Sequence, residues 1–321
     1  MQQIKRIAIM TSGGDAPGMN AFIRGSVRYG LEKGIEVYGI EEGYKGLINN
    51  DIYPMEFDSV CDIIHKGGTM LKTARSKEFM TLEGREKAAR NLEALEIDAL
   101  ICCGGNGSYA GLYSFANPED GVWKGQVIGV PGTIDNDIRG TDFTIGFDTA
   151  VNTAVEAIDR LRDTGDAHGR HFIVEVMGRH CGDIALAVGI ASGATYVAIP
   201  ETKTDIDAIV ATIKKTGHDI IIIAEGDEVG GANQLAEILK PHLEAITTEE
   251  NNPEFRVCIL GHIQRGGRPS ARDRVLAHEM ATTAVDAILT GKSLKAVSIK
   301  SGQISLDSDL VEKTKQVKIP A

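Results

Sequence analysis

The feature that most constrains this chain is a series of short apolar runs separated by longer stretches with helical spacing. Eight runs predict β-strands: Arg6–Thr11, Glu36–Ile40, Ala99–Cys103, Val127–Val130, Phe172–Met177, Tyr196–Ile199, Ile220–Ala224 and Arg256–Leu260. Several of them are apolar without alternation, which is typical of a parallel strand that is covered on both faces.

The stretches between the runs carry apolar residues four positions apart. Two of them predict amphipathic helices: Met19–Lys33, with Met19, Ile23, Val27 and Leu31, and Thr149–Arg162, with Val151, Val155, Ile158 and Leu161. Strands that alternate with helices predict a doubly wound α/β architecture. The length of 321 residues corresponds to two domains at roughly 150 residues each.

Charge and cysteine content exclude several classes of partner. Lys and Arg number 34 and Asp and Glu number 45, a net charge of −11, which argues against a nucleic-acid or membrane partner. No apolar run has the length of a spanning helix, and no signal-peptide pattern is present. The five cysteines contain no CxxC pair, so we expect reduced, buried cysteines in a cytoplasmic protein, with a zinc or redox site as the weaker alternative.

One segment between the predicted elements has the composition of a turn. Asn117–Lys124 (NPEDGVWK) contains the only tryptophan, Trp123. Because Asn, Pro, Asp and Gly favour turns, we expect this segment to be a surface turn that carries Trp123.

Two glycine-rich loops directly follow predicted strands. The first is Thr11–Asn20 (TSGGDAPGMN) and the second is Gly104–Ser108 (GGNGS). In an open α/β sheet such loops form the ligand crevice, and glycine lets backbone N–H groups approach a phosphate. The first loop lacks the ending of a Walker A motif. The pair favours a nucleotide site, and the second loop alone is also compatible with nicotinamide-nucleotide or lipid kinases.

A pair of carboxylates follows another strand in Pro131–Asp137 (PGTIDND). Asp135 and Asp137 are two residues apart, so in an extended segment both project to one side. Beside phosphate loops, one carboxylate accepts a proton from an attacking hydroxyl and the other orients a cation. An Asx turn that stabilises its own backbone is the alternative.

Arginines next to glycines and histidines recur in three places: His168–His171, Met177–Arg179 and Gly261–Gly267. The planar guanidinium group suits phosphate recognition. Three such clusters in an acidic chain favour a small polyanionic substrate, and a metal site at His168 and His171 is the less favoured interpretation.

Together these segments resemble the bacterial-type ATP-dependent 6-phosphofructokinases along nearly the whole chain. The combination of GGDAPGMN, PGTIDND, EVMGR and GHIQRGG carries the resemblance. It implies two doubly wound Rossmann-like domains with mostly parallel sheets and the active site in the cleft between them. It also implies transfer of the ATP γ-phosphoryl group to the 1-hydroxyl of fructose 6-phosphate, with Mg²⁺, by a homotetramer.

The resemblance also implies the domain boundaries. Residues 1–145 with about 263–309 would bind ATP, and residues 146–262 with about 310–321 would bind fructose 6-phosphate.

The resemblance assigns roles to individual positions. Asp135 would be the general base, with Thr133, Asp137 and Arg179 as further catalytic residues. The nucleotide would lie against Gly13, Arg75, Ser76, Gly105, Asn106, Gly107 and Ser108. The sugar phosphate would lie against Thr133, Asp135, Met177, Gly178, Arg179, Glu225, His262 and Arg265, with Arg170 and Arg256 reaching it from a neighbouring subunit.

Several positions depart from the family pattern or bear on the phosphoryl donor. Asn106 stands where relatives usually carry the Mg²⁺-ligating Asp. The pyrophosphate-dependent relatives usually carry Asp at position 107 and Lys at 132, where this chain has glycines, which favours ATP. A pyrophosphate-dependent enzyme and a catalytically weakened binding subunit, which Asn106 would explain, remain the alternatives.

The family's nucleotide-effector pocket is only partly kept. Arg24, Arg28, Arg162, Lys214 and His218 match it, whereas Phe57, Thr195 and Thr216 replace an arginine, a glutamate and a lysine. Because cationic partners and a metal ligand are lost, we expect an eroded effector site.

Overall fold

The computed structural model describes residues 3–168, 170–213, 219–245 and 255–307. Contacts between Cα atoms divide the chain into two compact units. The first unit contains the described residues of Met1–Ile134, Ile138–Asp148 and Arg265–Thr314, and the second contains those of Asp135–Asp137 and Thr149–Gln264. The predicted domain segment at about 310–321 lies outside the described residues.

The first unit is built on a seven-stranded sheet of order β11-β10-β5-β4-β1-β2-β3. The five inner strands, β10, β5, β4, β1 and β2, run parallel to one another. The edge strands β11 and β3 pair antiparallel with β10 and β2. The strands are β1 (Arg6–Ser12), β2 (Glu36–Ile40), β3 (Ile52–Met55), β4 (Ala99–Gly104), β5 (Gln126–Pro131), β10 (Lys295–Lys300) and β11 (Gln303–Asp307).

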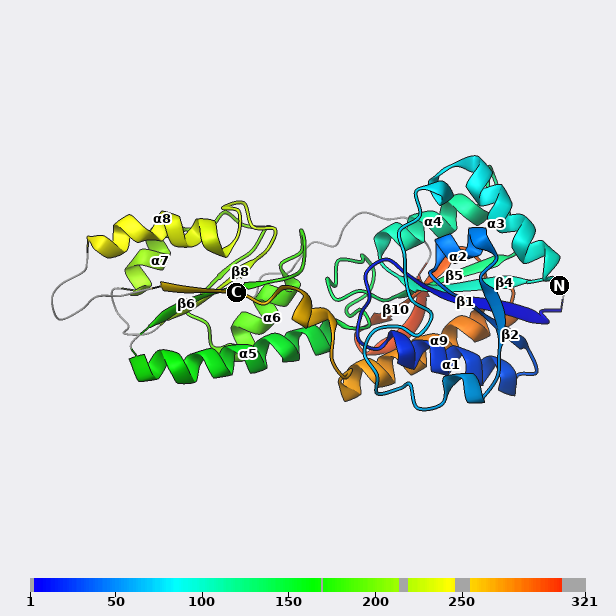
Figure 1. Cartoon of the computed structure of the whole chain (residues 1–321), viewed down its shortest axis with the longest axis horizontal. Helices are drawn as coiled ribbons and strands as arrows, with labels where there is room; N and C mark the ends of the chain where they lie inside the picture. Colours follow the sequence, from blue (N-terminus) through cyan, green and yellow to red (C-terminus); the bar gives the residue numbers. More distant parts are fainter. Residues whose placement is uncertain (1–2, 169, 214–218, 246–254, 308–321) are drawn as a thin grey trace. The chain divides into compact units, whose positions relative to one another are not determined.

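Helices cover both faces of this sheet (Figure 1), with α1 and α9 on one side and α3 and α4 on the other. The helices of this unit are α1 (Met19–Glu32), α2 (Tyr44–Asn49), α3 (Leu82–Ala94), α4 (Asn106–Ala116) and α9 (Ala271–Leu289), with short 3₁₀ turns η1 (Asp58–Val60) and η2 (Glu78–Met80). Strands β1 and β4 are buried almost throughout, which explains their continuous apolar sequences.

The second unit contains a four-stranded, all-parallel sheet of order β7-β8-β6-β9. Its strands are β6 (His171–Val176), β7 (Tyr196–Ala198), β8 (Ile220–Ala224) and β9 (Phe255–Ile259). Helices α5 (Phe147–His168) and α6 (Asp183–Ser192) lie on one face, and α7 (Ile206–Ile213) and α8 (Ala232–Glu244) on the other (Figure 1). The 3₁₀ turn η3 (Gly261–Arg265) follows β9. Both sheets confirm the predicted α/β class.

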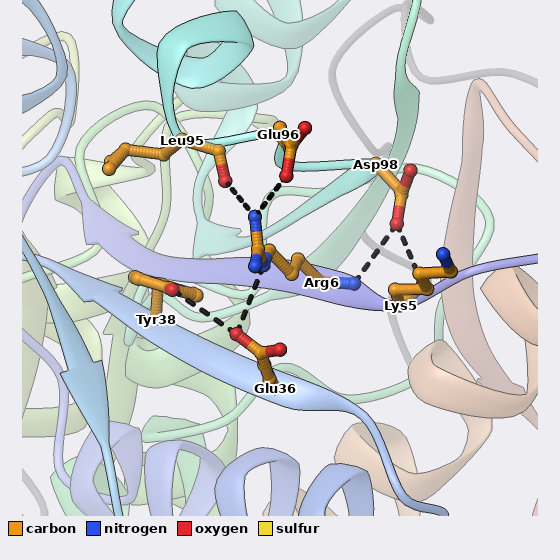
Figure 2. Close-up of polar contacts among 7 residues, drawn as sticks. All are labelled: Lys5, Arg6, Glu36, Tyr38, Leu95, Glu96 and Asp98. Carbon is orange, nitrogen blue, oxygen red and sulfur yellow. Dashed lines mark hydrogen bonds and ion pairs between the residues drawn. The ribbon is translucent and has the colours of Figure 1, made fainter.

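A polar cluster fixes the amino ends of three strands in the first unit. In Figure 2 the Arg6 side chain of β1 reaches Glu36 on β2 at 3.0 Å and Glu96, just before β4, at 2.6 Å. The Asp98 carboxylate accepts hydrogen bonds from the backbone N–H groups of Lys5 and Arg6 at 2.7 and 3.0 Å. These contacts hold β1 in register between β2 and β4, at the end of the sheet away from the glycine loops.

Cysteine burial matches the prediction only in part. Cys102 and Cys103 are both buried, on a strand that is covered on both faces, and Cys181 is also buried. Cys61 is exposed because it follows the short surface turn η1, and Cys258 is half-buried on β9. All five cysteines are free thiols.

The prediction for Trp123 is wrong. Its side chain is only 2% exposed and stacks on Phe115 with ring centroids 5.4 Å apart. Phe115 also contacts Phe79, which stacks on Tyr44. Asn117 makes the turn by accepting hydrogen bonds from the backbone of Glu119 and Asp120. The chain then returns and buries the Trp123 indole, because burial of a large aromatic side chain stabilises the fold strongly.

The burial of Trp123 predicts a simple optical result. Because the chain has one tryptophan, its fluorescence reports this site alone. We expect a blue-shifted emission that iodide quenches weakly, and a loss of about 3–5 kcal/mol in unfolding free energy for Trp123→Ala. Trp123→Phe should lose less. Strong iodide quenching in the native protein would contradict the burial.

Candidate functional site

The two glycine-rich loops meet where the strand order of the first unit reverses. The chain proceeds from β1 to β2 on one side and from β4 to β5 on the other, and Ser12 at the end of β1 pairs with Gly104 at the end of β4. Gly13 has a φ of +88°, and its Cβ position lies 3.5 Å from the Ser108 Oγ atom. Such a switch point is where open α/β sheets bind ligands.

Glycine is required at Gly104 and leaves space at Gly107. A Cβ atom on Gly104 would lie 2.5 Å from the backbone oxygen of Ser12 and closer still to Ser108 Oγ. A Cβ atom on Gly107 would have no neighbour within 4 Å. Helix α4 begins at Asn106 after Gly105, with no side-chain cap at its N-terminus. A helix N-terminus with a glycine that meets no neighbour in its first turn is an arrangement that suits a phosphate group.

The loop after β5 joins the same edge. The Gly132 N–H donates to the Gly104 carbonyl at 3.1 Å, and the Cβ position of Gly105 lies 3.8 Å from Thr133 Cβ. The Thr133 carbonyl accepts a hydrogen bond of 2.6 Å from Thr144 Oγ1. The structure therefore brings Gly13, Gly105 and Thr133 together.

Arg75 and Ser76 lie on a loop that is tied to the first glycine loop. Thr73 Oγ1 donates to the Gly13 carbonyl at 2.5 Å, and Arg75 follows two residues later with an exposed side chain. Ser76 Oγ accepts a hydrogen bond from the Phe79 N–H at 3.2 Å, so its hydroxyl caps η2. Arg265 also belongs to this unit, and its guanidinium donates to the Asp15 carbonyl at 3.2 Å.

In the second unit, Asp135 and Arg179 come together. Asp135 is 2% exposed, and its carboxylate lies 3.4 Å from the Arg179 Nε atom. Arg179 adopts a φ of +53°, and its backbone N–H donates to Glu225 Oε1 at 3.0 Å. A buried carboxylate next to a cationic side chain is an arrangement that can take up a proton beside an anionic ligand.

The Met177–Arg179 turn is held by the loops after β8 and β9. Gly178 has a φ of +139° and packs against the Cys181 carbonyl, and Gly226 packs against the Arg179 carbonyl. The Met177 N–H donates to Gln264 Oε1 at 2.9 Å, and Gln264 is fully buried. His262 lies in the same 3₁₀ turn, η3, with an exposed side chain. Sequence reasoning missed Gln264, although it stands inside the GHIQRGG motif.

The segment that carries the two aspartates is not extended, which corrects the prediction. Asn136 adopts a left-handed φ of +51°, so Asp135 and Asp137 do not follow the alternation of a strand. The Asn136 amide donates to Asp183 Oδ2 at 2.7 Å. Asparagine tolerates this backbone conformation, and the hydrogen bond fixes it. Asp135 is buried and Asp137 half-buried.

Arg170 and Arg256 are separated from the other sugar-phosphate candidates of the second unit. Arg170 directly precedes β6, and Arg256 pairs with Phe172 at the amino end of the sheet. Met177–Arg179 follows the carboxyl end of the six-residue strand β6. At about 3.3 Å per residue, the two ends lie roughly 17 Å apart. One copy of this unit does not bring these groups together.

Several residues of the expected effector pocket make contacts within their own unit. The Arg28 guanidinium lies 5.7 Å from the centre of the Phe57 ring, and Arg24 is half-buried one turn earlier in α1. In the second unit, Arg162 donates to the Ser192 carbonyl at 2.6 Å, and Thr195 Oγ1 donates to Asp219 at 2.9 Å. Lys214, Thr216 and His218 lie outside the described residues.

Comparison with known proteins gives the family. The sequence profile of the Phosphofructokinase family matches residues 6–288. The chain belongs to the phosphofructokinase family. It is 50% identical over 314 residues to the ATP-dependent 6-phosphofructokinase of Clostridium botulinum (strain Loch Maree / Type A3), covering 96% of this chain and 93% of that protein.

Solved structures agree with this family assignment. The phosphofructokinase of Saccharomyces cerevisiae matches with a TM-score of 0.85 and 37% identity over 94% of this chain, which spans 44% of the yeast chain. A pyrophosphate-dependent phosphofructokinase from Marinobacter aquaeolei shares the fold, with a TM-score of 0.83 at 24% identity over 98% of this chain and 86% of that one.

Gly104 and Gly107, two of the three glycines of the second loop, predict opposite responses to substitution. Gly104→Ala should destabilise the phosphofructokinase fold by about 1–3 kcal/mol, because the added methyl group collides with the β1 backbone. Gly107→Ala should leave stability unchanged or raise it, since the site is open and alanine favours the helix. Chemical denaturation of both variants tests this geometry, and equal losses would contradict it.

Proposed function

We propose that this phosphofructokinase transfers the γ-phosphoryl group of ATP to the 1-hydroxyl of fructose 6-phosphate, giving fructose 1,6-bisphosphate and ADP. The observation that carries the proposal is the 50% identity, over nearly the full length, to a protein named ATP-dependent 6-phosphofructokinase. The three loops that meet at β1, β4 and β5 supply the backbone approach that phosphoryl transfer needs.

The donor is ATP rather than pyrophosphate. A carboxylate at position 107 would repel the ATP α-phosphate, and Gly107 leaves that space open. At position 132 even a Cβ atom would overlap Cys103 Sγ, so the lysine that the pyrophosphate-dependent relatives carry does not fit here without a rearrangement.

The nucleotide lies against the two glycine loops. Gly13, Gly105 and Gly107 present backbone N–H groups and the α4 N-terminus to the phosphates. Ser108, whose own N–H donates to the Gly105 carbonyl at 3.0 Å, lies beside them, and Arg75 neutralises the phosphate charge. Ser76 borders this site. The positions of these residues around the strand ends support this role.

The sugar phosphate lies against the Asp135–Asp137 segment, the loops after β6 and β8, and the turn η3. Asp135 accepts the proton of the 1-hydroxyl as this oxygen attacks the γ-phosphorus, and Thr133 and Asp137 orient the reacting groups. Met177, Gly178, Glu225, His262 and Arg265 hold the sugar and its phosphate. Arg179, which lies 3.4 Å from Asp135, stabilises the negative charge of the transferred group.

Magnesium enters with the nucleotide in this proposal. Among the described residues, no three His, Cys, Asp or Glu side chains come together as a metal cage. Mg²⁺ is commonly held by substrate phosphates with one or two protein ligands, and this fits a site to which the chain adds only the Asn106 amide oxygen. The bound ion would neutralise phosphate charge.

We propose that the enzyme is a homotetramer, and the positions of Arg170 and Arg256 support sites that are shared between copies of the chain. Arg170 and Arg256 lie at the far end of the sheet from Met177–Arg179, so they serve a sugar-phosphate site only in another copy of the chain. Two-fold contacts between copies place such residues reciprocally.

The effector pocket is eroded in this proposal, because Arg28 lies over the ring of Phe57, which stands where relatives carry an arginine.

We place the enzyme in the cytoplasm, where glycolytic phosphorylation of sugars takes place. The five free cysteines support this location. Across the residues that the structure describes, no helix has the length and apolar character to cross a bilayer.

Turnover assays test the proposed reaction. With fructose 6-phosphate and Mg²⁺, ATP should support turnover far better than pyrophosphate, and Asp135→Asn should lower kcat by about 10²- to 10⁴-fold. A preference for pyrophosphate would contradict the donor assignment. If neither donor supports turnover although both substrates bind, the chain is a binding subunit.

The amide at position 106 predicts a measurable metal requirement. Asn106→Asp should lower the free Mg²⁺ concentration for half-maximal rate by about tenfold, because a carboxylate binds Mg²⁺ more strongly than an amide. Titration of free Mg²⁺ at fixed ATP measures this, with the wild type as control. An unchanged or higher requirement in Asn106→Asp would contradict the assignment of position 106.

Subunit mixing tests the shared site. Asp135→Asn and Arg256→Ala subunits should each be inactive alone. After joint refolding, hybrids contain sites with both residues intact and should regain roughly a quarter of the wild-type activity under random mixing. If Arg256 served its own subunit, hybrids would regain nothing.

A further inference from the structure

Loop 66–75, which carries Arg75, lacks regular secondary structure. Between η1 and η2 no strand ladder or helix fixes its backbone, so other groups must hold it. A loop held only by solvent would leave the Arg75 side chain without a defined position.

Asn20, the second residue of α1, holds the first part of this loop. Its side chain is 4% exposed. The amide nitrogen donates to the carbonyls of Lys66 and Gly67, both at 3.1 Å, and the amide oxygen accepts from the Met70 N–H at 2.7 Å. All of these bonds run to backbone atoms. An asparagine amide is the group of this size that offers two donors and an acceptor at once.

Two threonines hold the second part of the loop. Thr11 Oγ1, at 0% exposure on β1, lies 2.8 Å from both the Lys72 carbonyl and the Thr69 hydroxyl. Thr73 Oγ1 donates to the Gly13 carbonyl at 2.5 Å. Lys72 adopts a φ of +55°, which turns the chain between these two anchors. The loop is thus bonded along its length to β1, α1 and the first glycine loop.

We propose that Asn20 and Thr11 are positioning residues for the kinase reaction, acting through loop 66–75 to hold Arg75 beside the first glycine loop. The proposal rests on the proposed function, since it assumes that Arg75 meets the ATP phosphates. It gives a function to the first and last residues of the TSGGDAPGMN motif, Thr11 and Asn20. Neither residue needs to touch the substrate.

The most direct test is Asn20→Asp. This change keeps the side-chain shape and the bond from Met70 N–H, but it places a carboxylate against two carbonyl oxygens. We expect kcat/KM for ATP to fall by about 100-fold, because the misplaced guanidinium no longer meets the phosphates. The KM for fructose 6-phosphate should not change.

Asn91→Asp is the matched control. Asn91 is half-buried, and its amide also donates to two backbone carbonyls, those of Leu47 and Ile48, at 2.9 Å each. Its substitution should cost similar stability and leave kcat/KM for ATP unchanged. Equal kinetic losses in the two variants would show that general destabilisation causes the effect, and would overturn the proposal.

A double-mutant cycle separates positioning from structural support. If Asn20 acts through Arg75, Asn20→Asp should lower kcat/KM by less than about threefold when Arg75 is already Gln. Additive losses would overturn the proposal. Thr11→Val, which keeps the side-chain volume, gives the same cycle in case Asn20→Asp fails to fold.

The wild-type protein in the same assay distinguishes a failure of the proposed function from a failure of the positioning role. A wild type without ATP-dependent turnover would overturn the proposed function and this inference with it. An active wild type, together with unimpaired Asn20→Asp and Thr11→Val variants, would overturn the positioning role alone.

Discussion

The close approach of three backbones at the carboxyl ends of β1, β4 and β5 is the constraint on which the rest of the first unit depends. The backbone contact is so close that Gly104 has no space for a Cβ atom against Ser12, and the Gly132 N–H bonds directly to the Gly104 carbonyl. Because the side chains are absent there, main-chain N–H groups and the α4 N-terminus border the space that a phosphate would fill. The cluster around Arg6 at the opposite end of the sheet fixes the register that makes this approach possible.

The second unit uses the same strand-end geometry for a different chemistry. There, charged side chains replace bare backbone: Asp135 lies against Arg179, and the Arg179 backbone is held by Glu225. Polar side chains that donate to or accept from loop backbones recur in both units, with Asn20 in one and Gln264 in the other. In these two loops, side-chain hydrogen bonds to the backbone replace the bonds of regular secondary structure, and a buried amide takes part in each.

The parts of the fold that follow from continuous apolar runs were predictable, and those that depend on tertiary contacts were not. All eight predicted strands occur with ends within one residue, since strands covered on both faces must be apolar throughout. The edge strands β3, with Pro54, and β11 were missed because edges carry polar or interrupted sequences. Strand β10 was also missed, although it lies inside the sheet, because Ser298 interrupts its apolar residues and lysines flank them. Trp123 was predicted on a surface turn but is buried in an aromatic stack. The Asp135–Asp137 segment was predicted as extended, but Asn136 is left-handed and bonded to Asp183. The motifs indicated the candidate site, and the resemblance already assigned Arg170 and Arg256 to a neighbouring subunit. The sheet topology adds that Arg256 and Met177 lie at opposite ends of the second unit's sheet.

The measurement that tests this account most directly is a crystal structure of the wild-type protein with a non-hydrolysable ATP analogue. We predict that the phosphates lie against Gly13 and Gly105–Ser108, with the Arg75 guanidinium beside them. The Asn20 amide should keep its bonds to Lys66, Gly67 and Met70 of loop 66–75. A nucleotide bound elsewhere, with no phosphate at the ends of β1 and β4, would contradict the central claim that these strand ends form the phosphate site.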